Sequence, residues 1–244
     1  MLATLAQLRQ ALGFADGDTD HDALLTAILQ RVSDRLARYA GRVAEGMPCL
    51  EKSAGTIVQY FSPERGERVL WLPARPVVSV AEIKEASYGD FDNADALVEN
   101  TGYQLAADRG ELIRIGTWLA GDLTVRVTYT GGFTPCAAWV SGAAYTAGDV
   151  AYYGRAVYTC SDDVTDTTPP PSDEDHWTPA TGQRPLPEDV THACLLQAAY
   201  WFQRRDSLGL ASAGSGGGSF AQADADNLLA EVSHTMDAYR QRLG

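Results

Sequence analysis

The N-terminal part of the chain carries apolar side chains at helical spacing. Leucines three and four residues apart predict a short helix over residues 3–12, which Gly13 ends. The polar stretch that follows leads into a second helix, for which Asp20 is the expected N-cap. Gly41 closes this longer amphipathic helix. Its apolar face consists of Leu25, Ile28, Leu29, Val32, Leu36 and Tyr39.

The hydrophobic period changes in the middle of the chain. Short β-branched and aromatic runs there predict about six strands. The candidates are residues 56–61, 69–72, 77–83, 103–106, 111–115 and 123–129. In the last run Leu123, Val125, Val127 and Tyr129 alternate with polar residues, which is typical of a half-buried antiparallel strand. This region is therefore expected to form an antiparallel sheet.

Helical spacing returns after residue 184. Pro187 followed by two acidic residues is typical of a helix start. The apolar face of that helix consists of Val190, Cys194, Leu195, Ala198, Trp201 and Phe202. Residues 209–219 have the composition of a flexible Gly-rich linker. A last helix is predicted over about 221–243, with one apolar stripe. The stripe consists of Leu228, Leu229, Val232, Met236, Tyr239 and Leu243.

Residues 137–183 carry an aromatic and glycine pattern that the rest of the chain lacks. It consists of Trp139, Tyr145, Gly148, Asp149, Val150, Tyr152, Gly154, Tyr158, Cys160, Pro170 and Trp177. The sequence on either side would close into one domain without this stretch. We therefore expect a body made of residues 1–136 and 184–244, with residues 137–183 inserted as a β module. The predicted fold class is α+β: a bundle of about four helices with an antiparallel β region, plus a small all-β inserted domain.

The charge balance limits the classes of partner. The formal net charge is −13, which argues against a protein that reads nucleic-acid sequence through a basic face. A like-charged wall would instead let DNA pass without sticking. No apolar run is long enough for a transmembrane helix, and the start MLATLAQLRQ does not have the pattern of a signal peptide.

The sequence predicts no catalytic, cofactor or metal site. Its four cysteines form no CxxC pair and are expected to be buried thiols. Its four histidines are scattered, and no GxSxG elbow or phosphate-binding loop is present. We therefore expect a protein that is not an enzyme.

Three stretches of the body, in this order, resemble the head–tail connector (adaptor) family of long-tailed phages. They are TLAQLRQAL with DALLTAILQRVSDRLARYAGR, then LPARPVVSVAEIK with LTVRVTYTGGF, then LPEDVTHACLLQAAYWFQRRDSLG. The family usually joins the second stretch to the third through a short loop, and here that loop carries residues 137–183.

The resemblance implies a structural head-completion protein. Such a protein forms a homo-oligomeric ring, commonly of twelve copies, that docks on the portal protein and meets the next neck or tail protein. DNA would pass through the lumen without specific binding, and no membrane or cofactor would be involved. The expected location is the virion neck, after assembly in the host cytoplasm. Leu228, Val232, Met236 and Tyr239 on the last helix are the candidates for contact with the portal or with a neighbouring subunit.

The inserted stretch resembles the small chitin-binding type of carbohydrate-binding module, through a Trp, the run YxxGDxVxYxGxxYxC and a second Trp. The candidate glycan contacts are Trp139, Tyr145, Tyr153 and Trp177. Sugar-binding versions usually carry an exposed aromatic pair where this chain has Ser161, Asp162 and Asp163. The other interpretation is that these aromatic residues form the core of a very small domain. A glycan-binding protein with a helical scaffold is therefore the alternative function.

Overall fold

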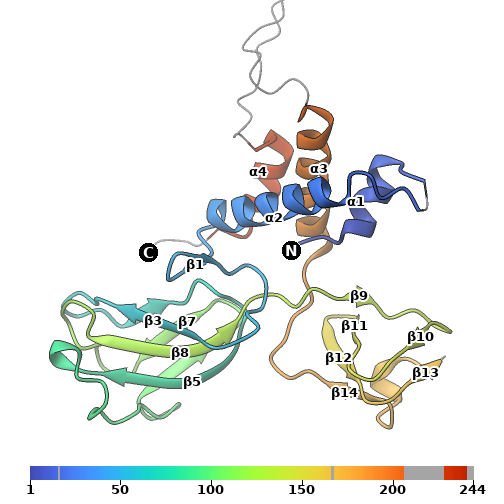
Figure 1. The fold of residues 1–244 in the computed structure, drawn as a ribbon. Helices are drawn as coiled ribbons and strands as arrows, with labels where there is room; N and C mark the ends of the chain where they lie inside the picture. Colours follow the sequence, from blue (N-terminus) through green and yellow to red (C-terminus); the bar gives the residue numbers. More distant parts are fainter. Residues whose placement is uncertain (16, 166–167, 206–227, 241–244) are drawn as a thin grey trace, which may run out of the picture. The chain divides into compact units, whose positions relative to one another are not determined.

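The structure is a computed structural model, and it describes residues 1–15, 17–165, 168–205 and 228–240. The chain divides into two compact units. One unit combines Met1–Gly41 with Pro187–Gly244 and is helical in its described residues, and the other, Arg42–Leu186, is built mainly from strands (Figure 1). The α+β class predicted from the sequence is confirmed.

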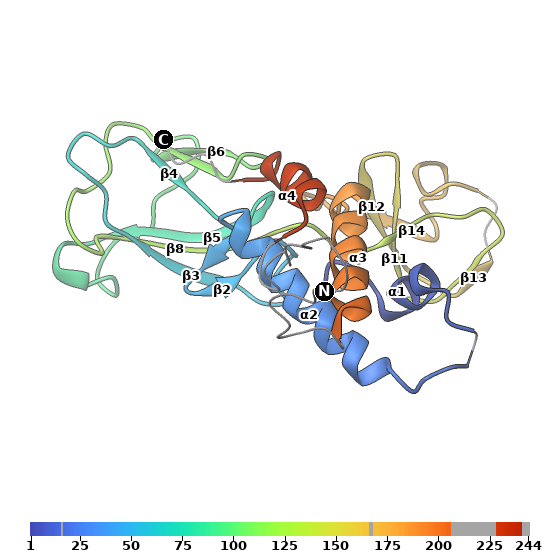
Figure 2. The same cartoon turned by 90° about the horizontal axis from the view of Figure 1, so that it is seen from above.

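The described part of the helical unit contains four helices. They are α1 (Leu5–Leu12), α2 (Asp22–Tyr39), α3 (Glu188–Gln203) and α4 (Ala230–Asp237). The helix α3 contacts each of the other three and so forms the centre of this unit (Figure 2). Its core is made by the apolar faces that the sequence predicts. Leu8, Leu25, Leu29, Val32, Leu36, Val190, Ala198, Val232 and Met236 are all buried.

The first two helices begin and end for local reasons. Thr4 and Gln7 form a reciprocal capping box at the start of α1, and Gly13 adopts the left-handed conformation at its end. Asp20 is not the N-cap of α2, as the sequence had suggested, because His21 holds that position. The acid at the helix start is instead Asp22, whose carboxylate lies 3.5 Å from the Arg9 guanidinium.

The last helix is shorter than predicted. It begins at Ala230, and residues 221–227 and 241–243 of the predicted helix, Leu243 among them, lie outside the described residues, as does the Gly-rich stretch 209–219. Leu228 and Leu229 precede the helix, and the Leu229 N–H donates to Gln197 Oε1 at 2.9 Å. Tyr239 lies in the turn after the helix. The side chain of Gln197 on α3 therefore fixes the chain just before α4 begins.

Residues 43–131 form two three-stranded antiparallel sheets and one hairpin. The strands are β1 (Val43–Ala44), β2 (Met47–Pro48), β3 (Ile57–Phe61), β4 (Val69–Trp71), β5 (Val77–Glu85), β6 (Tyr103–Ala106), β7 (Glu111–Arg114) and β8 (Val125–Gly131). The sheet orders are β3-β8-β5 and β4-β7-β6. Both sheets contribute to one core, in which Leu70 and Leu112 meet Val125, Val127 and Tyr129. The predicted strands are confirmed, and the β1–β2 hairpin is an addition.

The start of β8 corrects the prediction for Leu123. The sequence placed this leucine on the inner face of a strand, but it lies in the loop before β8 with φ at +48°. Its N–H donates to the Ser62 hydroxyl at 2.8 Å, which is a bond to a loop rather than to a neighbouring strand. The leucine side chain is exposed rather than part of the core.

Residues 137–179 form strands that pair with one another. They are β9 (Ala137–Ala138), β10 (Ala144–Tyr145), β11 (Val150–Tyr153), β12 (Ala156–Cys160), β13 (Val164–Thr165) and β14 (Trp177–Pro179). Four of them form a sheet in the order β14-β12-β11-β9, and β10 pairs with β13. Ala151, Tyr158, Cys160 and Trp177 make a separate small core for this stretch.

The chain segments that flank residues 137–183 lie side by side. Thr134 N–H donates to the Arg184 carbonyl at 2.8 Å, and Leu186 N–H donates to the Thr134 carbonyl at 2.9 Å. The Thr134 hydroxyl also donates to Gln183 Oε1 at 2.8 Å. The chain therefore leaves at Thr134 and returns beside this residue at Arg184.

Candidate functional site

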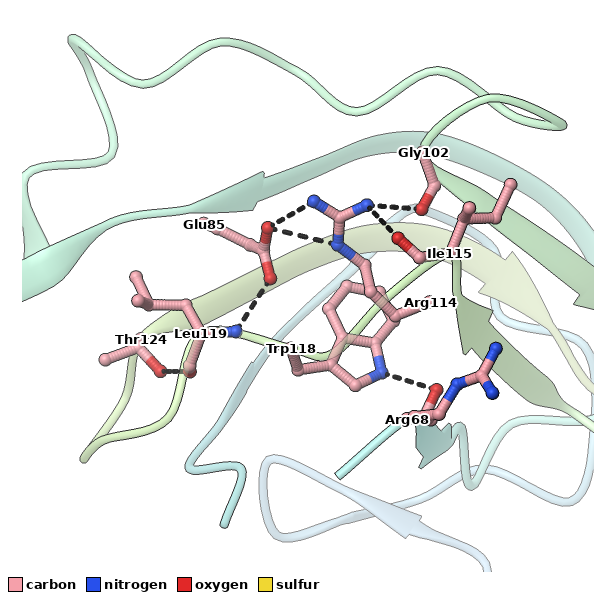
Figure 3. Close-up of polar contacts among 8 residues, drawn as sticks. All are labelled: Arg68, Glu85, Gly102, Arg114, Ile115, Trp118, Leu119 and Thr124. Atoms are coloured by element: carbon pink, nitrogen blue, oxygen red, sulfur yellow. Dashed lines mark hydrogen bonds and ion pairs between the residues drawn. The ribbon is translucent and has the colours of Figure 1, made fainter. Parts of the chain in front are cut away.

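A partly buried ion pair joins the ends of two strands from different sheets. Arg114, the last residue of β7, donates from Nη2 and Nε to Glu85 Oε2 at 2.9 and 3.2 Å (Figure 3). Glu85 is the last residue of β5. The same guanidinium donates to the Gly102 carbonyl. Because its guanidinium donates to both a carboxylate and a carbonyl, the Arg114 side chain is held in one position, and it holds the ends of β5 and β7 together.

The ion pair also holds the segment between β7 and β8. Glu85 Oε1 accepts the Leu119 N–H at 2.8 Å. The Trp118 ring is buried beneath the segment, its Nε1–H donates to the Arg68 carbonyl at 3.0 Å, and the Arg114 guanidinium lies 5.8 Å from the ring centroid (Figure 3). The Thr124 hydroxyl closes the segment by donating to the Leu119 carbonyl at 2.5 Å. A loop without regular structure is therefore pinned along its whole length.

This pinned loop presents apolar side chains to solvent. Ile115, Leu119 and Leu123 are 47%, 37% and 51% exposed. We call these three residues the apolar tip. Exposed apolar residues on a fixed loop are typical of a protein contact surface, since the entropy of ordering the loop has already been lost. The sequence analysis missed the tip, because Ile115 and Leu123 were both assigned to strands.

The predicted portal-contact residues on the last helix turn inward. Val232 and Met236 have no accessible surface in the single chain, where α4 packs on α3. The Tyr239 hydroxyl donates to Asp189 at 2.7 Å. Leu228 is partly buried before the helix. The apolar stripe that was expected to need an external partner therefore has one within its own unit.

Three of the four predicted glycan contacts are core residues of residues 137–179. Trp177 is buried, and Tyr145 packs against it edge-on with ring centroids 4.9 Å apart. Trp139 is partly buried in the same cluster. Tyr153 alone of the four is largely exposed, at 44%, and it meets the Trp139 ring edge-on at 5.9 Å. Three of the four rings therefore form part of a small core, and one is exposed to solvent.

The remaining candidate residues are cysteines and histidines. All four cysteines are free, and burial raises the pKa of the Cys49 thiol to about 12 and that of Cys136 to about 11. His176 Nδ1 lies 2.9 Å from Asp173 Oδ2. No group of potential metal ligands occurs among the described residues. None of the helices in the described ranges has the length and apolarity needed to span a bilayer.

Comparisons with known proteins give a likeness in fold. No protein-family model matches the chain, and no curated protein sequence matches it. A chain in the neck of an empty GTA particle, computed with C6 symmetry, aligns with a TM-score of 0.51 and 15% identity. The alignment covers 98% of this chain and 89% of that chain. The protein therefore shares its fold with a neck chain of a GTA particle.

Two further solved structures align less closely. A chain in the virion of the native gene transfer agent (GTA) particle has a TM-score of 0.48 and 16% identity, covering 98% of this chain and 89% of that chain. A chain in the neck of the native GTA particle, computed with C12 symmetry, has a TM-score of 0.43 and 15% identity, covering 97% and 87%.

Proposed function

We propose that the protein is a structural adaptor in the neck of a tailed phage or phage-like particle. It forms a ring that docks on the portal protein and extends the DNA channel toward the next neck or tail protein. The observation that carries this proposal is the fold shared with a GTA neck chain over nearly the whole length. The ordered sequence resemblance to head–tail connectors supports it independently.

The apolar tip is the contact surface that suits this function. A ring subunit must present preformed complementary surfaces, because heterologous contacts have to close after a fixed number of copies. Ile115, Leu119 and Leu123 are exposed on a loop held by Glu85 and Trp118. We assign the tip, in place of the buried residues of α4, to contact with the portal protein or a neighbouring subunit.

Residues 137–183 are proposed to be an autonomous module inserted into the adaptor body. Their strands pair among themselves around a separate core. The flanking segments meet at Thr134, so the two ends of the stretch lie side by side, as they do in a loop that accepts an insertion. The glycan-binding alternative rests on Tyr153, the one predicted contact that is largely exposed. A single exposed ring is a weaker platform for sugar stacking than a pair.

The proposal is tested by locating the chain in particles. A small epitope tag at the N-terminus, detected by antibody labelling and electron microscopy, is expected at the junction of head and tail. Co-purification of the tagged chain with the portal protein of the same particle is the biochemical counterpart. Label on the capsid shell or at the tail tip would contradict the adaptor role. Retention of untagged particles on chitin, lost in Tyr153→Ala, would favour the glycan-binding alternative.

A further inference from the structure

A long loop between β5 and β6 carries acids but no bases. Residues 86–102 contain four acidic residues and no lysine or arginine. One of the four, Asp90, accepts hydrogen bonds from the Asn93 amide at 3.0 Å. The other three are Asp92, Asp95 and Glu99, and we call them the acidic rim. All three are exposed, and no ion pair or hydrogen bond holds their carboxylates among the described residues. These charges are therefore available to a partner.

The loop is held in place by two anchoring side chains. Phe91 is buried, its ring centroid lies 5.6 Å from that of Tyr60, and the Arg126 guanidinium lies 5.1 Å from its centre. Leu97 packs against the core of the two sheets, and its N–H donates to the Ile83 carbonyl at 2.8 Å. A loop fixed in this way loses little conformational entropy when it meets a partner. The acidic rim thus has a defined position before any contact forms.

The acidic rim lies next to the apolar tip. Val98 belongs to the same loop, is 64% exposed, and its carbonyl accepts the Gly102 N–H at 2.7 Å. The Gly102 carbonyl accepts the Ile115 N–H at 3.0 Å, so the two loops are joined beside the first residue of the tip (Figure 3). Arg114, which also donates to this carbonyl, is already held in an ion pair. Val98 therefore adds an exposed apolar side chain near the tip, with the rim beside it.

An apolar centre with a free acidic border selects the chemistry of its partner. Protein contact surfaces commonly combine an apolar centre with a polar border, and opposite charges across that border speed association and suppress wrong partners. The matching surface is therefore one of apolar side chains bordered by lysine or arginine. A DNA backbone does not match, because its phosphates would meet carboxylates.

The exposed apolar surfaces of a second copy do not have this basic border. Apart from Met1, the other exposed large apolar side chains of the described residues are Leu24, Met47, Val58, Tyr60, Val140, Val150 and Tyr153. The last three lie in residues 137–183, which contain seven acidic residues and one arginine. Leu24 lies in the first turn of α2 with Asp22, and Met47 and Val58 line a groove with two glutamates and one lysine. The Tyr60 N–H donates to Glu45, and Arg126 opposite Tyr60 is paired with Glu82. These surfaces would bring acids or balanced charge to the rim.

We infer that the apolar tip, Val98 and the acidic rim together bind the portal protein, at a surface whose apolar side chains are bordered by lysine or arginine. The inference rests on the proposed adaptor function, which assigns the tip to the portal protein or to a neighbouring subunit, and the charge of the rim selects the first. Carboxylates at the edge of such a contact stay partly in water, so salt weakens the contact by screening their charge.

Charge reversal on the rim tests this contact. Binding of the purified chain to the portal protein of the same particle is measured by biolayer interferometry at low and at physiological salt. Asp95→Lys with Glu99→Lys should weaken binding about tenfold or more at low salt, because attraction becomes repulsion at two positions. Glu174→Lys with Asp175→Lys is the matched control and should leave binding unchanged. Both control carboxylates are exposed and free of ion pairs among the described residues.

A second pair of variants tests the apolar part of the contact. Val98→Ala should weaken binding to the portal protein about threefold, because less apolar area is buried. Val140→Ala removes the same atoms from a valine of similar exposure, and it should leave binding unchanged. Sedimentation velocity of the chain alone should show the same self-association for all four variants as for the unchanged chain.

The outcomes separate this inference from the proposed function. Far-ultraviolet circular dichroism first establishes that each variant is folded. No portal binding by the unchanged chain, undiminished binding by the rim variant, or an equal loss in its control overturns the inference. Self-association that the rim variant loses, with portal binding unchanged, also overturns it and assigns the rim to a neighbouring subunit. If the chain is found in necks although the rim variant binds normally, the function stands; if binding depends on the rim but particles lack the chain, the contact stands alone.

Discussion

At the scale of single residues, two glycines are needed at the end of β8, where other backbone segments approach closely. Gly131 ends β8, and a Cβ atom built on it would lie 2.0 Å from the Ala74 carbonyl oxygen. Gly132 is similarly close to the Glu51 carbonyl, with φ at +104°. Two loops therefore cross the end of β8 at distances that only glycine permits.

Gly131→Ala is expected to lower the free energy of unfolding by about 2–4 kcal/mol, since backbone must move to accept the methyl group. Chemical denaturation of the purified variant measures the change. Gly55→Ala is the matched control, because nothing lies within 4 Å of its Cβ position and its φ is not positive. Equal stabilities for the two variants would contradict the role of the close approach.

Leu123 allows binding to be separated from stability. Its left-handed backbone disfavours a leucine by about 1–2 kcal/mol, and its side chain is exposed. Leu123→Gly is thus expected to leave the melting temperature unchanged or slightly higher while weakening association with the ring partner. Leu24→Ala, at an exposed leucine on α2, is the control and should leave association unchanged. Undiminished association of Leu123→Gly would remove this residue from the contact surface.

At the scale of elements, α4 behaves as a core helix. Val232 and Met236 are buried against α3, while the Tyr239 hydroxyl donates to Asp189 in the first turn of that helix. Burial and the hydrogen bond to Asp189 raise the pKa of Tyr239. A short helix of this kind gains its stability from tertiary packing rather than from its own propensity.

Met236→Ala should therefore reduce the stability of the helical unit by about 2–4 kcal/mol. Thermal unfolding followed by circular dichroism at the helical wavelengths gives the change. Glu231→Ala on the exposed side of the same helix serves as the comparison and should shift the melting temperature little. A stable Met236→Ala chain that fails to assemble would return α4 to the role of an external contact.

At the scale of the whole molecule, the segments just before and just after residues 137–183 contact each other directly. The two flanking segments are joined at Thr134 by backbone hydrogen bonds to residues on the returning segment. Neighbouring strands lie about 4.8 Å apart, so a few residues can bridge the gap. We therefore expect the rest of the chain to fold without residues 137–183.

Deleting residues 137–183 and joining the ends through a short Gly-Ser linker should leave a soluble chain with a cooperative unfolding transition. The isolated stretch should fold as well, as judged by dispersed amide signals in its proton NMR spectrum. An aggregated or unfolded body after deletion would show that these residues belong to the main core.

The sequence by itself determined most of the elements. Helical spacing of apolar residues predicted α1 to α3, and Pro187 with its acidic neighbours marked the start of α3. Alternation predicted the central part of β8. These features are local, because a buried helix face or strand face leaves its period in the chain whatever it packs against.

Only the tertiary structure decided which surfaces are free. An apolar stripe has the same pattern whether its partner is in the same chain or in another, so the sequence could not show that Val232 and Met236 pack on α3. The apolar tip depends on Glu85 reaching Leu119 across distant positions. Exposure and long-range contact are properties of the assembled fold, and no local pattern carries them.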